Sequence, residues 1–133
     1  MSRKTTTVIL RLMSVAFLAG AAILYILHIE GSDSYALRNT MPVLVAVLLA
    51  SVTVWRGDGS WTRSGWSWPL ATLGFAIPAL GLSMYLHHGY ATDMLGMYSD
   101  AVYPRELFRF LPLYTMFAGG IGFAIGWIVG REV

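Results

Sequence analysis

The sequence contains no cysteine among its 133 residues. Disulfide bonds, iron–sulfur clusters, thiolate metal sites and cysteine nucleophiles are therefore excluded. Charge is also scarce, since charged residues make up 12% of the chain and apolar residues 56%. Soluble globular domains carry about 25% charged residues, so this composition indicates a membrane protein.

Charged side chains are missing above all from the middle of the long apolar stretches. From Leu12 to Leu27, for example, the polar residues are Ser14 and Tyr25. Ion-coupled carriers usually hold a buried carboxylate, histidine or arginine on their pathway, so autonomous secondary transport is disfavoured. The sequence also has no phosphate-binding loop, nucleophile elbow or His-Glu-x-x-His motif, and we therefore expect a protein that is not an enzyme.

What the sequence does contain is four long apolar runs. A bilayer core takes about 20 helical residues to cross, and the runs are apolar on all faces, unlike alternating barrel strands. We therefore predict an all-α membrane protein, a single domain over residues 1–133 with four transmembrane helices and short loops. The second run is short, so its helix should begin nearer Tyr35 or the bilayer should thin locally. The predicted spans are residues 8–28, 41–55, 66–86 and 110–130.

The basic residues predict the orientation of these spans. One side of the predicted topology carries six of them and the other side three, and the positive-inside rule places the richer side in the cytoplasm. Both termini are then cytoplasmic, the longest loop (residues 89–103) is external, and the expected location is a prokaryotic inner membrane. All five tryptophans fall near the cytoplasmic boundary, where they would anchor helices at headgroup level. The six basic residues are Arg3, Lys4, Arg11, Arg56, Arg63 and Arg131, and the other three are Arg38, Arg105 and Arg109.

Small residues recur at helical spacing in the last two spans. Such spacing lets two helix backbones approach closely in a membrane. The partner helix can belong to the same bundle or to another chain, and the pattern favours neither strongly. The predicted packing residues are Ala118, Gly122, Gly126 and Gly130 in the fourth span and Ala71, Gly74 and Gly81 in the third.

Three histidines lie at the predicted external ends of the first and third spans, and methionines follow the third. Imidazole with thioether suits copper, imidazole with carboxylate suits zinc, and paired histidines can ligate haem b. Because histidine also favours interfaces, we expect no bound metal or haem and keep that site as the alternative. The candidate ligands are His28, His87, His88, Met94 and Met97. Near the start of the fourth span, Arg105 and Arg109 are candidates for binding lipid phosphates or an acidic partner.

Taken together, these features predict an accessory or structural subunit of a larger membrane complex, such as a transporter or respiratory assembly. Its partners would be the lipid bilayer and other integral membrane subunits or copies of itself, with no nucleic acid. Two alternatives stay open. One is a metal- or haem-binding protein that uses the external histidines, and the other is a small channel or lipid-handling protein.

Overall fold

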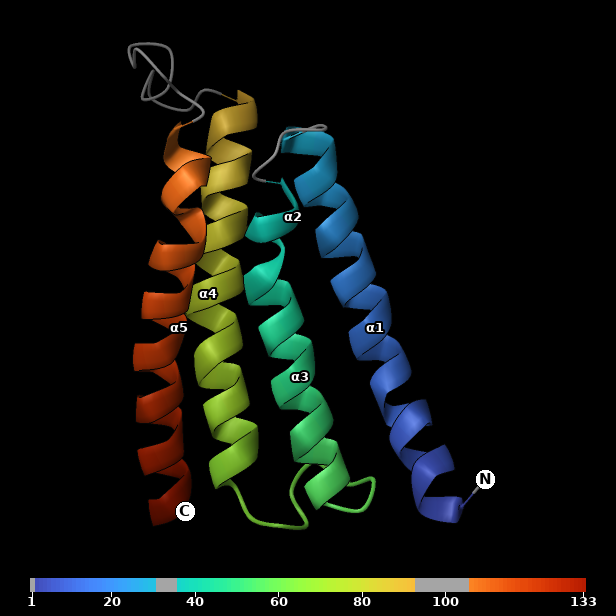
Figure 1. Ribbon diagram of the computed structural model, residues 1–133. Coiled ribbons are helices and arrows are strands. Elements are labelled where there is room, and N and C mark those ends of the chain that lie inside the picture. Colours follow the sequence, from blue (N-terminus) through green and yellow to red (C-terminus); the bar gives the residue numbers. More distant parts are fainter. Residues whose placement is uncertain (1, 31–35, 93–105) are drawn as a thin grey trace.

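The computed structural model describes residues 2–30, 36–92 and 106–133, and Figure 1 shows that they form helices and an irregular loop. The helices are α1 (Arg3–Glu30), the one-turn α2 (Ala36–Asn39), α3 (Met41–Arg56), α4 (Ser67–Thr92) and α5 (Glu106–Glu132), and the irregular loop joins α3 to α4. Within the described residues, four helices are long and apolar enough to cross a membrane. The prediction of an all-α protein with four such helices is confirmed.

The helix boundaries differ from the predicted spans mainly at the start of α1, at the end of α4 and at the start of α5. α1 begins at Arg3, five residues before its predicted start. α4 continues to Thr92, so residues 89–92 are helical and not part of the predicted loop. α5 begins at Glu106, four residues before its predicted start. A span of about 20 residues crosses only the hydrocarbon core, and a longer helix extends into the headgroup layer on either side.

The second span is divided in two. α3 has 16 residues and is preceded by α2, with Thr40 between them. The Thr40 hydroxyl donates a hydrogen bond back to the Leu37 carbonyl oxygen at 2.6 Å and makes no cap hydrogen bond to α3. Pro42 has no backbone N–H to donate at the start of α3, which favours this break. The second span, whose helix was expected to begin near Tyr35, therefore begins with α2 as a separate helical turn.

The long helices run alternately up and down and form a row in chain order, as Figure 1 shows. α4 and α5 lie closest together, α3 packs on α4, and α1 packs mainly on α3 at the edge of the row. Both termini lie at the same end of the molecule. Of the apolar window in each helix, 44% is buried in α3 but only 6% in α1, so α3 is the interior helix and α1 is peripheral.

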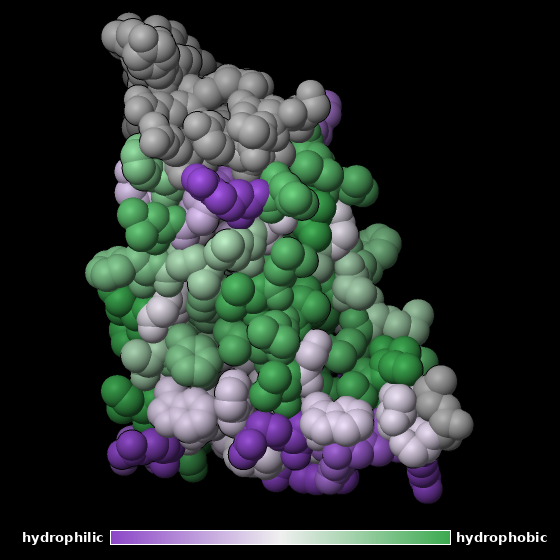
Figure 2. All heavy atoms as spheres, viewed as in Figure 1, coloured by the Kyte–Doolittle hydropathy of each residue, from purple (hydrophilic) through white to green (hydrophobic). Residues whose placement is uncertain are grey.

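The surface of the row matches a lipid environment. Figure 2 shows hydrophobic residues over the middle of the molecule and hydrophilic residues at the end where the termini lie. Large apolar side chains stand fully outward from this middle belt, among them Phe17, Ile77 and Phe117. A continuous apolar belt of this kind would be an aggregation hazard in water and is the normal surface of a multi-pass membrane protein.

Candidate functional site

The closest helix contact joins α4 and α5 through their glycines. A Cβ atom added to Gly74 would collide with the Gly122 carbonyl oxygen, and one added to Gly122 would collide with the Gly74 carbonyl oxygen. Gly126 faces the backbone of Leu70 and Ala71 in the same way. The backbones of the two helices therefore touch, and only glycine leaves room for this contact.

The other predicted packing residues divide between this contact and the surface. Gly130 lies against the backbone of Trp66 and Ser67, whereas Gly81 is exposed and a Cβ there would meet nothing within 4 Å. Gly81 was thus wrongly assigned to the close contact. Gly81 lies on the same face of α4 as Leu70 and Gly74, but about one turn beyond Pro78, where the backbones of the two helices no longer touch.

On α5 the structure adds a glycine that the spacing rule missed. Gly119 is buried, and a Cβ there would meet the Phe75 ring and the Ala79 side chain. Ala118, which was predicted instead, is only half-buried. The strict four-residue count favoured Ala118, while a step of three residues from Gly122 leads to Gly119. The adjacent pair Gly119-Gly120 was the available signal.

The candidate metal ligands occupy three different environments. His28 near the end of α1 and His88 on α4 are exposed, whereas His87 is fully buried. The buried His87 forms a local hydrogen bond within α4. Its Nδ1 lies 2.7 Å from the Ser83 carbonyl oxygen, and since a carbonyl can only accept, Nδ1 donates this hydrogen bond.

Among the described residues, no three side chains of histidine, cysteine, aspartate or glutamate come together as metal ligands would. The side chains of the other candidate residues are not among those that the structure describes. Met94, Met97 and Arg105 lie outside the described residues, and Arg109 belongs to α5 with its side chain also outside them.

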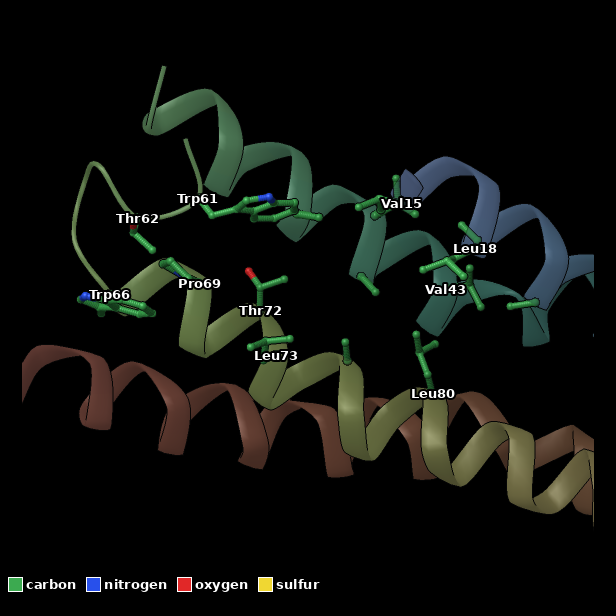
Figure 3. Close-up of a pocket in the computed structure, with 16 residues that line it drawn as sticks. Val15, Leu18, Val43, Trp61, Thr62, Trp66, Pro69, Thr72, Leu73 and Leu80 are labelled. Carbon is green, nitrogen blue, oxygen red and sulfur yellow. The ribbon is translucent and has the colours of Figure 1, made fainter. Parts of the chain in front are cut away.

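A groove lies between α1, α3 and α4, and its volume is about 480 Å³. Figure 3 shows Trp61, Thr62 and Trp66 at one end and Val43 and Leu80 toward the other. Apart from two threonine hydroxyls and two indole N–H groups, the lining side chains are hydrocarbon. Small side chains create the space, namely Ala19 and Ala22 from α1, Ala46 and Ala50 from α3, and Ala76 from α4.

The groove exists because α1 is packed against the rest of the bundle near its two ends and is separated from α3 and α4 in between. Of residues 2–29, only Val8 and Ile26 are buried. They lie about five helical turns apart and so face the same side of α1. Leu18 on α1 and Leu73 on α4 are exposed at the groove, which therefore opens to the surroundings between these helices.

The N-terminal end of α1 is held in place by a contact with the turn after α3. The Lys4 ammonium lies 3.0 Å from the Asp58 carboxylate and 4.0 Å from the centre of the Trp55 ring. Gly59 fits against the Thr7 side chain with φ of 96°, a conformation and a space that only glycine takes easily. The turn after α3 therefore packs closely against the N-terminal end of α1.

One hydrogen bond crosses the floor of the groove. The hydroxyls of Thr53 on α3 and Thr72 on α4 lie 2.9 Å apart and are buried, and Thr53 also donates to the Leu49 carbonyl oxygen at 2.7 Å. These pairings satisfy the polar atoms that would otherwise face lipid. The groove itself is left almost wholly apolar.

The basic residues at this end of the molecule differ in the contacts that their side chains make. Lys4 is paired with Asp58, and the Arg56 guanidinium lies 5.6 Å from the centre of the Trp68 ring. Arg11 and Arg63 are exposed, and their side chains have no hydrogen-bond or ion-pair partner among the residues that the structure describes. Each neighbours a lining residue of the groove, since Arg63 directly follows Thr62 and Arg11 lies one turn before Val15 on the same stripe of α1.

Sequence reasoning missed this groove. It weighed glycines as packing residues and tryptophans as lipid anchors, but not the alanines of α1, α3 and α4 as a set. The available signal was the series Val15, Ala19 and Ala22 with Arg11 one turn before it, a stripe of small residues that ends in a cation. Comparison with protein-family models, with curated proteins and with solved structures finds no match to this chain.

Proposed function

We propose that the protein is a non-enzymatic lipid-handling protein of a prokaryotic inner membrane, which holds the acyl chain of a lipid in the groove between α1, α3 and α4. The observation that carries this proposal is the lining of the groove, which is almost wholly apolar and lies between helices long and apolar enough to cross a membrane. Ligand sites are concave and largely apolar, and this volume lies within their usual range of roughly 300–1,000 Å³.

The length of the groove favours a chain from one leaflet. Along α4 the lining extends from Pro69 to Leu80, which corresponds to about 16 Å of helix. This is a little more than half of the roughly 30 Å hydrocarbon thickness. The tryptophans Trp61 and Trp66 at one end would mark the headgroup level of that leaflet.

A single flexible hydrocarbon chain can follow this groove, whose volume is about 480 Å³.

Filling the groove with larger side chains tests the proposal. Ala19→Phe places a ring in the groove, and Ala16→Phe places the same ring on the exposed side of α1. We expect the wild-type protein extracted in mild detergent to retain one lipid in native mass spectrometry. Ala19→Phe should reduce the retained fraction about tenfold, because loss of the packing contacts weakens binding by on the order of 1.4 kcal/mol.

The control variant decides how that result is interpreted. Ala16→Phe should retain lipid as the wild type does. Equal retention by the two variants would contradict the groove as the binding site, and a wild-type protein without lipid would contradict the proposed function.

A second candidate function is the accessory subunit of a larger membrane complex, such as a transporter or respiratory assembly. The observation that favours it is the low burial of α1, which leaves Phe17 and Leu24 facing outward. Another integral membrane subunit or a second copy could pack there. Photo-crosslinkers at these two positions should then capture a stoichiometric polypeptide in the native membrane, whereas capture of lipid alone would argue against this candidate.

A further inference from the structure

An acyl chain in the groove would gain little selectivity from its hydrocarbon part. Lipid tails are as apolar as the leucine and alanine side chains that line the groove, so no hydrophobic force distinguishes the groove from the bilayer. Every phospholipid supplies a similar chain. Any choice among lipids must therefore come from groups at the end of the groove where the headgroup would lie.

That end of the groove is basic. Arg63 follows the lining residue Thr62 in the loop, and Arg11 lies one turn before the lining residue Val15 on the same stripe of α1, so both arginines neighbour the lining at this end. Arg11 begins inside the apolar span, and its long side chain can extend along the helix to place the charge at headgroup level. Of the nearby charges, Asp58 is already paired with Lys4, and Arg56 lies over Trp68.

We infer that the groove is selective for an anionic phospholipid, whose chain lies between α1, α3 and α4 and whose phosphate is held by Arg11 and Arg63. This inference rests on the proposed function and adds the class of lipid to it. Guanidinium groups bind phosphate oxygens through paired, charge-assisted hydrogen bonds. Trp61 and Trp66 frame the position where chain and headgroup meet.

The test compares two lipids that differ only in headgroup charge. The protein is reconstituted in bilayers of equimolar phosphatidylglycerol and phosphatidylcholine with identical chains, extracted in mild detergent and analysed by native mass spectrometry. Two arginines near an anionic headgroup predict that retained phosphatidylglycerol exceeds phosphatidylcholine by on the order of 10- to 30-fold. The preference should fall when extraction is repeated at high salt, because ions screen these charges.

The variants separate the headgroup contact from chain binding. In the Arg11→Gln, Arg63→Gln double variant, the ratio of the two retained lipids should fall to near one while a lipid is still retained. Arg3→Gln with Arg131→Gln removes the same charge from positions that do not neighbour the lining, since α5 contributes no lining residue and Arg3 lies about three turns before Val15, and this variant should keep the wild-type ratio. If the double variant does not fold, Arg63→Gln alone, a change in an exposed loop, should still lower the ratio several-fold.

The possible failures are distinguishable. A wild-type ratio near one with lipid retained would overturn the selectivity for an anionic lipid and leave the proposed function standing. Absence of any retained lipid would overturn both. An equal fall in the ratio for the two double variants would show that net charge matters and would overturn the assignment to Arg11 and Arg63.

Discussion

Gly74 and Gly122 face each other across α4 and α5 so closely that each occupies the space where the other's side chain would begin. Such an approach maximises dispersion contacts between backbones, which is a main source of helix association where no hydrophobic force acts. The contact is intramolecular. It fastens the last two helices into a unit on which α3 then packs through Ala46, Phe75 and Ala79.

A leucine at Gly122 should force this unit apart. We expect Gly122→Leu to lower the free energy of unfolding by more than about 1 kcal/mol, because the side chain meets the Gly74 carbonyl and the Pro78 ring. Thermal unfolding in detergent measures the change. Gly120→Leu is the matched control, since that glycine is exposed and has the same gain in helix propensity. Equal melting temperatures for the two variants would contradict the contact.

The buried His87 should contribute to the stability of the bundle. Replacing the buried His87 by leucine removes the hydrogen bond to the Ser83 carbonyl and changes the shape of a fully buried side chain. The free energy of unfolding should fall by about 1–3 kcal/mol. Tyr85→Leu, on the exposed side of the same helix, should change it by less than about 0.5 kcal/mol. Denaturation in mixed micelles gives both values, and comparable losses would count against the role of His87.

The ion pair at the lower end of α1 should stabilise the fold only modestly. Lys4 and Asp58 are both partly exposed, so water screens their attraction. A double-mutant cycle with Lys4→Gln and Asp58→Asn should give a coupling free energy of roughly 0.2–1 kcal/mol. Exchanging the two charges, by combining Lys4→Asp with Asp58→Lys, should restore part of this coupling. A coupling of zero would mean that the contact adds nothing to the docking of α1.

The orientation of the protein can be tested with single cysteines, because the chain contains none. The excess of basic residues at the end that carries both termini predicts that this end is cytoplasmic. In intact cells, an impermeant thiol reagent should label Thr92→Cys and not Ser60→Cys. After permeabilisation both should react, which controls for accessibility. Labelling of Ser60→Cys alone in intact cells would reverse the topology.

The helices themselves could be predicted closely from the sequence. Residues 41–55 were predicted and α3 spans Met41–Arg56, because Pro42 at the start and the Gly57-Asp58-Gly59 turn at the end leave little choice. The ends of α4 and α5 were predicted less well. Polar residues can continue a helix beyond the hydrocarbon layer, and hydropathy carries no information about where they stop.

The candidate site was much less predictable. To predict the close contact of Gly74 with Gly122, the small-residue spacing of α4 must be aligned with that of α5. Neither spacing by itself identifies the helix that it packs against. Predicting the groove requires more information, because the groove depends on the position of α1 relative to α3 and α4. Val8 and Ile26 did not differ from their apolar neighbours in the sequence, yet they are the positions at which α1 is buried.

Hydropathy and charge by themselves determined that this chain crosses a membrane four times as helices, because those are properties that each segment has toward its solvent. The tertiary structure alone decided which helices touch and where a gap remains. In lipid an apolar face gains nothing by being covered, so helix positions depend on local fit between backbones and side chains. Glycines bring α4 and α5 into contact, and α1, held at Val8 and Ile26, stands over a row of alanines with space for a chain.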